Sequence, residues 1–169
     1  MPISMHGASV PLFTQLLNAL SGVLDKGAAF AEARKVDPAV LLGSRLAPDM
    51  LTLTRQVQIA SDTSKACVAR LAGVETPKYE DTEASFDELK ARIAKTVAFF
   101  DTVTPAQIDG SEEREITIKL PSRELTFTGQ GYLVNWAIPN FTFHCATAYD
   151  ILRNNGVEIG KRDFLGAIQ

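Results

Sequence analysis

Apolar residues recur at intervals of three and four along most of this chain, and this restricts it to amphipathic helices packed on one another. One such stripe covers residues 8–33, a second begins near Asp49, a third follows Ser85, and a fourth covers residues 131–154. Each helix has one apolar face to bury, so these stripes predict a four-helix bundle. We therefore expect an all-α fold with a single domain over residues 1–169.

Three segments depart from the long-helix pattern. Residues 35–50 are interrupted by prolines and a glycine but keep several leucines, so we expect a short helix across one end of the bundle. Residues 116–127 alternate apolar and polar side chains on either side of a Pro-Ser pair, which predicts a small β-hairpin before the last helix. The tail, residues 156–169, carries Phe164 and Leu165 on a polar segment, and we expect it to dock back onto the bundle rather than cross to a neighbouring subunit.

The charge balance argues against polyanionic partners. There are 17 Lys and Arg residues against 20 Asp and Glu, a net charge of −3, so neither a nucleic acid nor a membrane surface is an expected partner. No apolar run approaches the roughly 20 residues needed to span a bilayer, and the N-terminus lacks the pattern of a secretion signal. We therefore expect a cytoplasmic protein in which Cys67 and Cys145 are reduced thiols.

Charged residues outside the apolar stripes are expected to be solvated. This prediction covers Glu80, Asp81 and Glu83 in the loop 74–85, and also Lys90, Arg92 and Lys95 on the third helix. On this interpretation none of them takes part in a functional site.

The last helix places two polar residues on its apolar stripe. The stripe consists of Leu133, Ala137, Asn140, His144, Ala148 and Ile151. An uncompensated polar group in a core costs roughly 2–7 kcal/mol, so Asn140 and His144 must be paired or bind something. Pro139 removes one backbone hydrogen bond just before them and is expected to bend the helix.

Two nitrogen ligands one helical turn apart, with a third from a facing helix, are a sound arrangement for a divalent metal. His144 suits this role, whereas the amide of Asn140 is a weak ligand for zinc or nickel. On the second helix Gln56 and Gln58 are available, and they too are amides. These residues supply one good ligand, so we expect no cofactor and keep a divalent metal at His144 as an alternative.

The segments APDMLTLTRQVQIASD and HCATAYDILRNNGVEIG, together with the order of four long helices, resemble the DinB/YfiT-like superfamily, in a branch of domains of unknown function. The resemblance covers nearly the whole chain and implies a DinB-like four-helix bundle. It also implies a divalent metal held by three histidines, one on the second helix and two spaced His-x-x-x-His on the fourth. Known activities of the superfamily resemble metal-dependent thiol transfer and the thiol-dependent isomerisation of maleylpyruvate.

The superfamily pattern can be laid on this sequence residue by residue. His144 takes the last histidine position, Asn140 takes the first position of the same pair, and Gln58 takes the second-helix position. Two of the three implied ligands are therefore replaced by amides. Gln56 lies closer than Gln58 to the apolar stripe of the second helix, so either glutamine is open as the residue that faces the site.

The sequence leaves three alternative functions. The expected one is binding of a small organic ligand between the second and fourth helices, at an altered, metal-free site lined by Gln58, Trp136, Asn140 and His144. The first alternative is a metal-dependent thiol transferase-like enzyme with His144 as a metal ligand. The second is a structural protein that forms a homodimer. A homodimer is also the assembly that we expect for the chain. No catalytic residue is identified.

Overall fold

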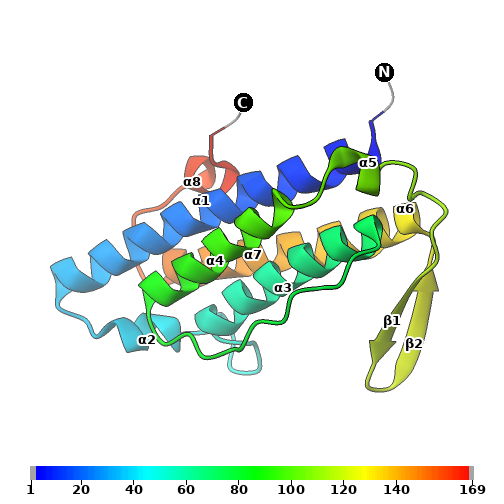
Figure 1. The fold of residues 1–169 in the computed structure, drawn as a ribbon. Helices are drawn as coiled ribbons and strands as arrows, with labels where there is room; N and C mark the ends of the chain where they lie inside the picture. Colours follow the sequence, from blue (N-terminus) through cyan, green and yellow to red (C-terminus); the bar gives the residue numbers. More distant parts are fainter. Residues whose placement is uncertain (1–2, 168–169) are drawn as a thin grey trace.

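The computed structural model describes residues 3–167, and four long helices form its framework (Figure 1). They are α1 (Met5–Arg34), α3 (Leu53–Ala72), α4 (Phe86–Phe100) and α7 (Ile138–Asn154). Helices α1 and α7 run in one direction and α3 and α4 in the other, as Figure 1 shows. Helix α3 packs against α4 and α7, and α1 packs against the same two helices. The predicted four-helix bundle is confirmed.

The remaining elements are short. They are α2 (Pro38–Leu42), α5 (Pro105–Ile108), β1 (Ile116–Leu120), β2 (Arg123–Phe127), α6 (Gly129–Tyr132), the π-helical η1 (Leu133–Ala137) and α8 (Lys161–Leu165). Strands β1 and β2 pair antiparallel, and their register aligns Ile116 with Phe127. Both the short helix between the first two long helices and the hairpin before the last helix are therefore confirmed.

The tail docks onto the bundle, as predicted. The Gln15 side-chain amide on α1 donates a hydrogen bond to the carbonyl oxygen of Leu165, at 2.8 Å. Lys26 forms an ion pair of 2.7 Å with Asp163 on α8. The ring of Phe164 packs against Tyr149 of α7, with 6.0 Å between ring centroids. Helix α8 thus lies against both α1 and α7.

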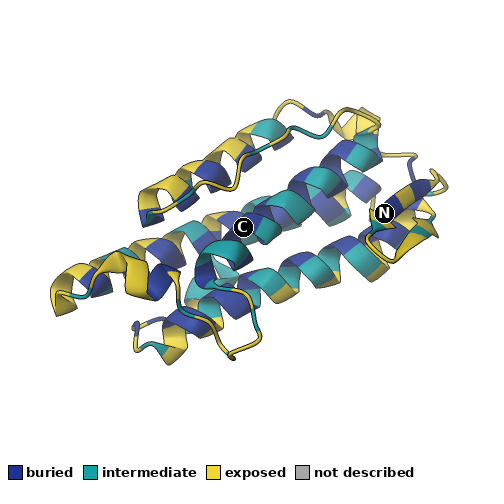
Figure 2. Cartoon of the chain, turned by 90° about the horizontal axis from the view of Figure 1, so that it is seen from below, coloured by how far each residue is buried: buried dark blue, intermediate teal, exposed yellow. Residues whose placement is uncertain are grey.

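Helix α1 is long and apolar enough to cross a membrane when judged by length and composition alone. From the sequence we predict no such segment, because small and uncharged polar residues interrupt the apolar ones between His6 and Asp25. These residues add no charge, so the length and composition of the helix still suffice. In the structure Phe13, Leu17 and Leu24 of α1 are fully buried, and Figure 2 shows buried positions along the length of the helices. The apolar face of α1 therefore forms part of the bundle core.

Helix α3 begins later than predicted. Its first residue is Leu53, not Asp49, and the hydroxyl of Thr52 caps it by accepting from the amide of Arg55. The Leu53 amide donates to the carbonyl of Ser44, at 2.9 Å. This bond closes the intervening segment into a loop, which explains why Asp49 lies outside the helix.

The prediction that Arg92 and the acidic loop face solvent is wrong for several side chains. Because α3 and α4 are parallel, the segment between them must run back along the bundle, and Figure 1 shows that it does. On the way it meets Arg92, whose side chain is only 2% exposed and forms ion pairs with Asp81 and Glu83. The charges of this loop therefore hold it against the helices.

The short helix α6, which leads into α7, requires glycine at position 129. Gly129 opens α6, and a Cβ atom there would overlap the carbonyl oxygen of Ser111. That backbone has little freedom to move, because the amide of Gln130 donates to the next carbonyl, that of Glu112. We expect Gly129→Ala to lower the free energy of unfolding by about 1–3 kcal/mol, measured by urea titration of the helical circular dichroism signal.

Gly22 of α1 provides the matched control for this substitution. A Cβ at Gly22 meets nothing within 4 Å, so Gly22→Ala should raise stability by about 0.4–1 kcal/mol. Equal unfolding midpoints for Gly129→Ala and the parent protein would contradict the close approach described here.

Candidate functional site

A π-helical turn lies directly before Pro139. The amide of Ile138 donates to the carbonyl of Leu133, five residues earlier, so η1 is one residue wider than an α-helical turn. A proline in a regular helix clashes with the carbonyl four residues before it, and the wider turn relieves that conflict. The local sequence thus explains where the π turn occurs.

The last long helix keeps most of its predicted buried stripe after the π turn. From Ala137 onward the buried residues are Ala137, Phe141, Cys145, Thr147, Ala148, Ile151 and Leu152. The prediction that Asn140 and His144 lie in the core is wrong, although Ala137, Ala148 and Ile151 of the same predicted stripe are buried. Both side chains are half-buried at the edge of this face. They still lie one helical turn apart on the same side of α7.

Gln56 of α3, and not Gln58, contacts the imidazole. His144 Nδ1 lies 2.6 Å from Gln56 Oε1, and Gln56 Nε2 donates to the carbonyl of Leu51 at 3.2 Å. Gln56 itself is buried. This resolves the choice that the sequence left open, and it links the loop before α3 to α7 through one carboxamide.

These two contacts fix the tautomer of His144. A backbone carbonyl only accepts, so the nitrogen of Gln56 must face Leu51 and its oxygen must face the ring. The oxygen accepts, so Nδ1 of His144 carries the proton. In the neutral ring Nε2 is then an unprotonated acceptor. Within residues 3–167 the hydrogen bond of the ring is the one through Nδ1, which leaves the Nε2 lone pair available.

Burial lowers the pKa of His144 below its ordinary value of 6.5. The cause is the loss of water around the charged form. The imidazole is therefore neutral at pH 7 and acts there as a hydrogen-bond acceptor or a base, not as a cation.

The other predicted site residues are not gathered around this ring. Gln58 faces the other side of α3, where its Nε2 donates to Glu83 at 2.7 Å and its Oε1 accepts from Arg55 at 2.6 Å. Trp136 lies about 12 Å before His144 along the helix axis and packs on Phe127 of the hairpin, at 6.0 Å between centroids. Asn140 shares the His144 side of α7. The structure thus joins Gln56 with His144, with Asn140 one turn away.

The side chains around His144 do not fit the metal site that the fold implies. A zinc or nickel site of this kind needs three imidazole, thiolate or carboxylate ligands. Here one imidazole stands with two carboxamides, and the Gln56 oxygen is already engaged by the ring. In the described part of the chain, no group of three His, Cys, Asp or Glu residues is placed to hold a metal ion.

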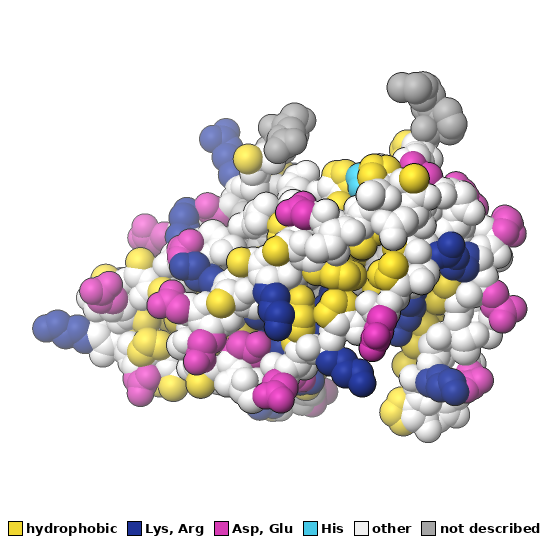
Figure 3. Space-filling model, viewed as in Figure 1, with side chains coloured by type: hydrophobic (Ala, Val, Ile, Leu, Met, Phe, Trp, Pro, Cys, Tyr) yellow, Lys and Arg dark blue, Asp and Glu magenta, His cyan; other side chains and the backbone are white. Residues whose placement is uncertain are grey.

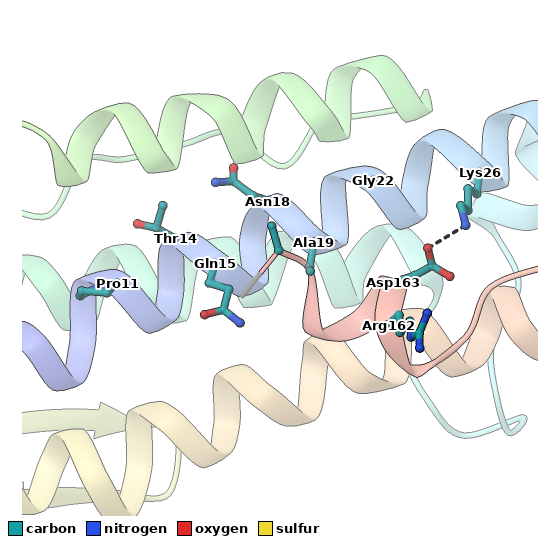
Figure 4. Close-up of a pocket in the computed structure, with 11 residues that line it drawn as sticks. Pro11, Thr14, Gln15, Asn18, Ala19, Gly22, Lys26, Arg162 and Asp163 are labelled. Atoms are coloured by element: carbon teal, nitrogen blue, oxygen red, sulfur yellow. Dashed lines mark hydrogen bonds and ion pairs between the residues drawn. The ribbon is translucent and has the colours of Figure 1, made fainter. Parts of the chain in front are cut away.

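A cavity of about 740 Å³ lies away from this site, between α1 and α8 (Figure 4). Thr14, Gln15 and Asn18 line it from α1, and Figure 4 shows the Lys26–Asp163 ion pair at one end. Gly166 and Ala167, the last described residues, also line it. The cavity therefore borders the chain end and has no contact with the imidazole.

The position of Gln56 has a signal in the sequence. It follows Leu53 by three residues and precedes Ala60 by four, so it falls at the helical spacing of two core residues. The π turn has a weaker signal, which is Pro139 inside an otherwise continuous helix.

Comparison with known proteins places the chain in a family. Residues 5–165 match the family described as Domain of unknown function (DUF1993). The crystal structure of a DinB family member from Shewanella denitrificans is similar, with 44% sequence identity and a TM-score of 0.87. The alignment covers 96% of this chain and 92% of that one. A comparison with curated proteins gives no match. The chain therefore belongs to the DUF1993 family of domains of unknown function and has the fold of a DinB family member.

Proposed function

We propose that this protein binds a small, uncharged organic ligand at the α3–α7 face through Nε2 of His144. The observation that carries the proposal is the oriented contact of Gln56 with Nδ1, at 2.6 Å. It holds the neutral ring with its acceptor nitrogen available, which suits a ligand that offers an O–H or N–H group. Asn140, one turn earlier, supplies a carboxamide that both donates and accepts.

The surroundings favour a ligand with an apolar or aromatic body. The ring of Phe143 is 54% exposed and lies 5.3 Å from the imidazole, measured between centroids. Ligand sites typically combine such apolar contact area with a few polar groups that set orientation. An aromatic compound with one hydroxyl group has both features.

Phenol and anisole provide a direct test, because anisole has a methyl group in place of the hydroxyl hydrogen of phenol and cannot donate a hydrogen bond. We expect phenol to shift the His144 ring resonances saturably in an NMR titration, and anisole to leave them unshifted. In His144→Phe, phenol should cause no saturable shift of the Gln56 side-chain amide resonances, while the helical circular dichroism signal is retained. Equal shifts with both compounds, or none with either, would contradict the proposal.

The two alternatives give different results. A metal-dependent transferase predicts near-stoichiometric zinc or nickel in protein purified without a nickel column, and loss of that metal in His144→Ala. If the protein is a structural homodimer, phenol should leave the His144 resonances unshifted, and analytical ultracentrifugation should show a dimer. Bound metal or a dimer, found together with no phenol binding, would favour that alternative over our proposal.

The role of Gln56 can be tested by introducing a negative charge at its position. Gln56→Glu puts a carboxylate on Nδ1, which favours the imidazolium and should raise the pKa of His144 by roughly 1–3 pH units. An NMR titration of the His144 Cε1 proton measures it. Gln58→Glu is the matched control, because Gln58 contacts Glu83 instead, and it should leave this pKa unchanged.

The sign of the stability change follows from the same pKa. In the parent protein the folded-state pKa of His144 is lowered, so its contribution to stability is present above pH 6.5 and is lost as the pH falls. In Gln56→Glu the folded-state pKa is raised, so the added stability is present below pH 6.5 and is lost as the pH rises. Matching pH–stability curves for the two proteins would contradict this assignment.

A further inference from the structure

The segment that returns from α3 to α4, residues 73–85, is attached to the bundle almost without apolar contact. We call it the strap. None of its residues is buried, although it runs along two helices (Figure 1). Acidic and basic side chains are interspersed on the face of the molecule drawn in Figure 3. The attachment of the strap therefore depends on polar contacts, unlike that of any long helix.

Arg92 of α4 contacts more residues of the strap than any other described side chain does. Its Nη1 donates to Glu83 at 2.9 Å and to the carbonyl of Glu80 at 3.1 Å. Its Nη2 lies 3.1 Å from Asp81 and 2.8 Å from Asp62 of α3. The guanidinium thus binds three strap residues and one α3 residue at the same time.

Helix α3 and Lys95 of α4 add a second set of polar contacts. Arg55 donates to Asp81 at 2.6 Å, and Gln58 donates to Glu83 at 2.7 Å. The ring of Tyr79 meets the ammonium group of Lys65 at 3.6 Å and that of Lys95 at 4.3 Å. Every one of these contacts pairs a charge with a charge, an amide or an aromatic face.

The layer of the bundle next to Arg92 is also polar. The hydroxyls of Ser61 and Thr96 lie 2.6 Å apart between α3 and α4, and both residues are fully buried. Arg92 Nε is buried without a hydrogen-bond partner in the described residues. Water entering such a layer can satisfy these groups, whereas an apolar layer would resist it.

We propose that the strap detaches as a unit while the four helices stay folded, and that Arg92 is the latch that holds it closed. Detachment exposes no buried strap side chain, so its free-energy cost comes mainly from the charge pairs. Segments with few buried apolar contacts open at lower free energy than the whole domain unfolds. Opening leaves Arg55, Lys65, Arg92 and Lys95 with one paired carboxylate, Asp62, so the uncovered face is cationic.

Limited proteolysis measures this opening. Trypsin cleaves after Lys78, inside the strap, and gives fragments 1–78 and 79–169 that mass spectrometry identifies. We expect Arg92→Met to increase the initial rate of this cleavage by about tenfold while the helical signal is retained, because cleavage follows the open population. Raising NaCl from about 0.05 to 0.5 M should also accelerate cleavage of the parent protein.

Two further variants keep the test decisive. Lys90→Met is the control on the same helix, because Lys90 pairs with Asp25 and Asp87 and not with the strap, and it should be cleaved at the parent rate. Asp81→Asn with Glu83→Gln weakens the latch from the strap side and leaves Arg92 in place. It should be cleaved faster even if Arg92→Met does not fold.

The proposal fails on either of two results. One is cleavage at the parent rate in the Asp81→Asn, Glu83→Gln variant. The other is cleavage after Lys78 that has the same urea dependence as loss of the helical signal, since the strap would then open only on global unfolding.

Discussion

The hydrogen bond between Gln56 and His144 is the interaction on which the candidate site depends. Gln56 is buried, and its amide nitrogen donates to the carbonyl of Leu51, so its oxygen faces Nδ1 of the imidazole. The helix that carries His144 accommodates Pro139 with the π turn Leu133–Ala137 and continues as the α-helix Ile138–Asn154. His144 is half-buried on this helix, so its ring meets the buried carboxamide of Gln56 through one nitrogen and leaves the other outside that bond.

Helix α3 separates two different polar environments. Gln56 faces α7 and holds a neutral imidazole, whereas Gln58, two residues later, faces the strap and joins a network of charges. Residues two apart on a helix point about 200° apart, so both arrangements fit on one helix without sharing a side chain. The first suits selective contact with an uncharged molecule. The second suits attachment of a segment that has no apolar anchor.

Much of the fold follows from the sequence because apolar periodicity is a strong signal. It predicts the four long helices and the hairpin, and the polar tail with two apolar residues predicts docking. The half-burial of His144 does not follow, because periodicity places it on the same stripe as Ala148 and Ile151, which are buried. The burial of Arg92 does not follow from its residue type, because arginine is usually solvated unless it is paired. Its spacing of three from Leu89 and four from Thr96, both buried, indicates the core side instead.

The central claim is that Gln56 holds His144 as the neutral tautomer with the proton on Nδ1. A long-range ¹H–¹⁵N correlation spectrum of the parent protein at neutral pH reports which ring nitrogen is protonated. The account predicts a protonated Nδ1 and an unprotonated Nε2. A proton on Nε2, or on both nitrogens, would contradict it and remove the basis for the proposed ligand site.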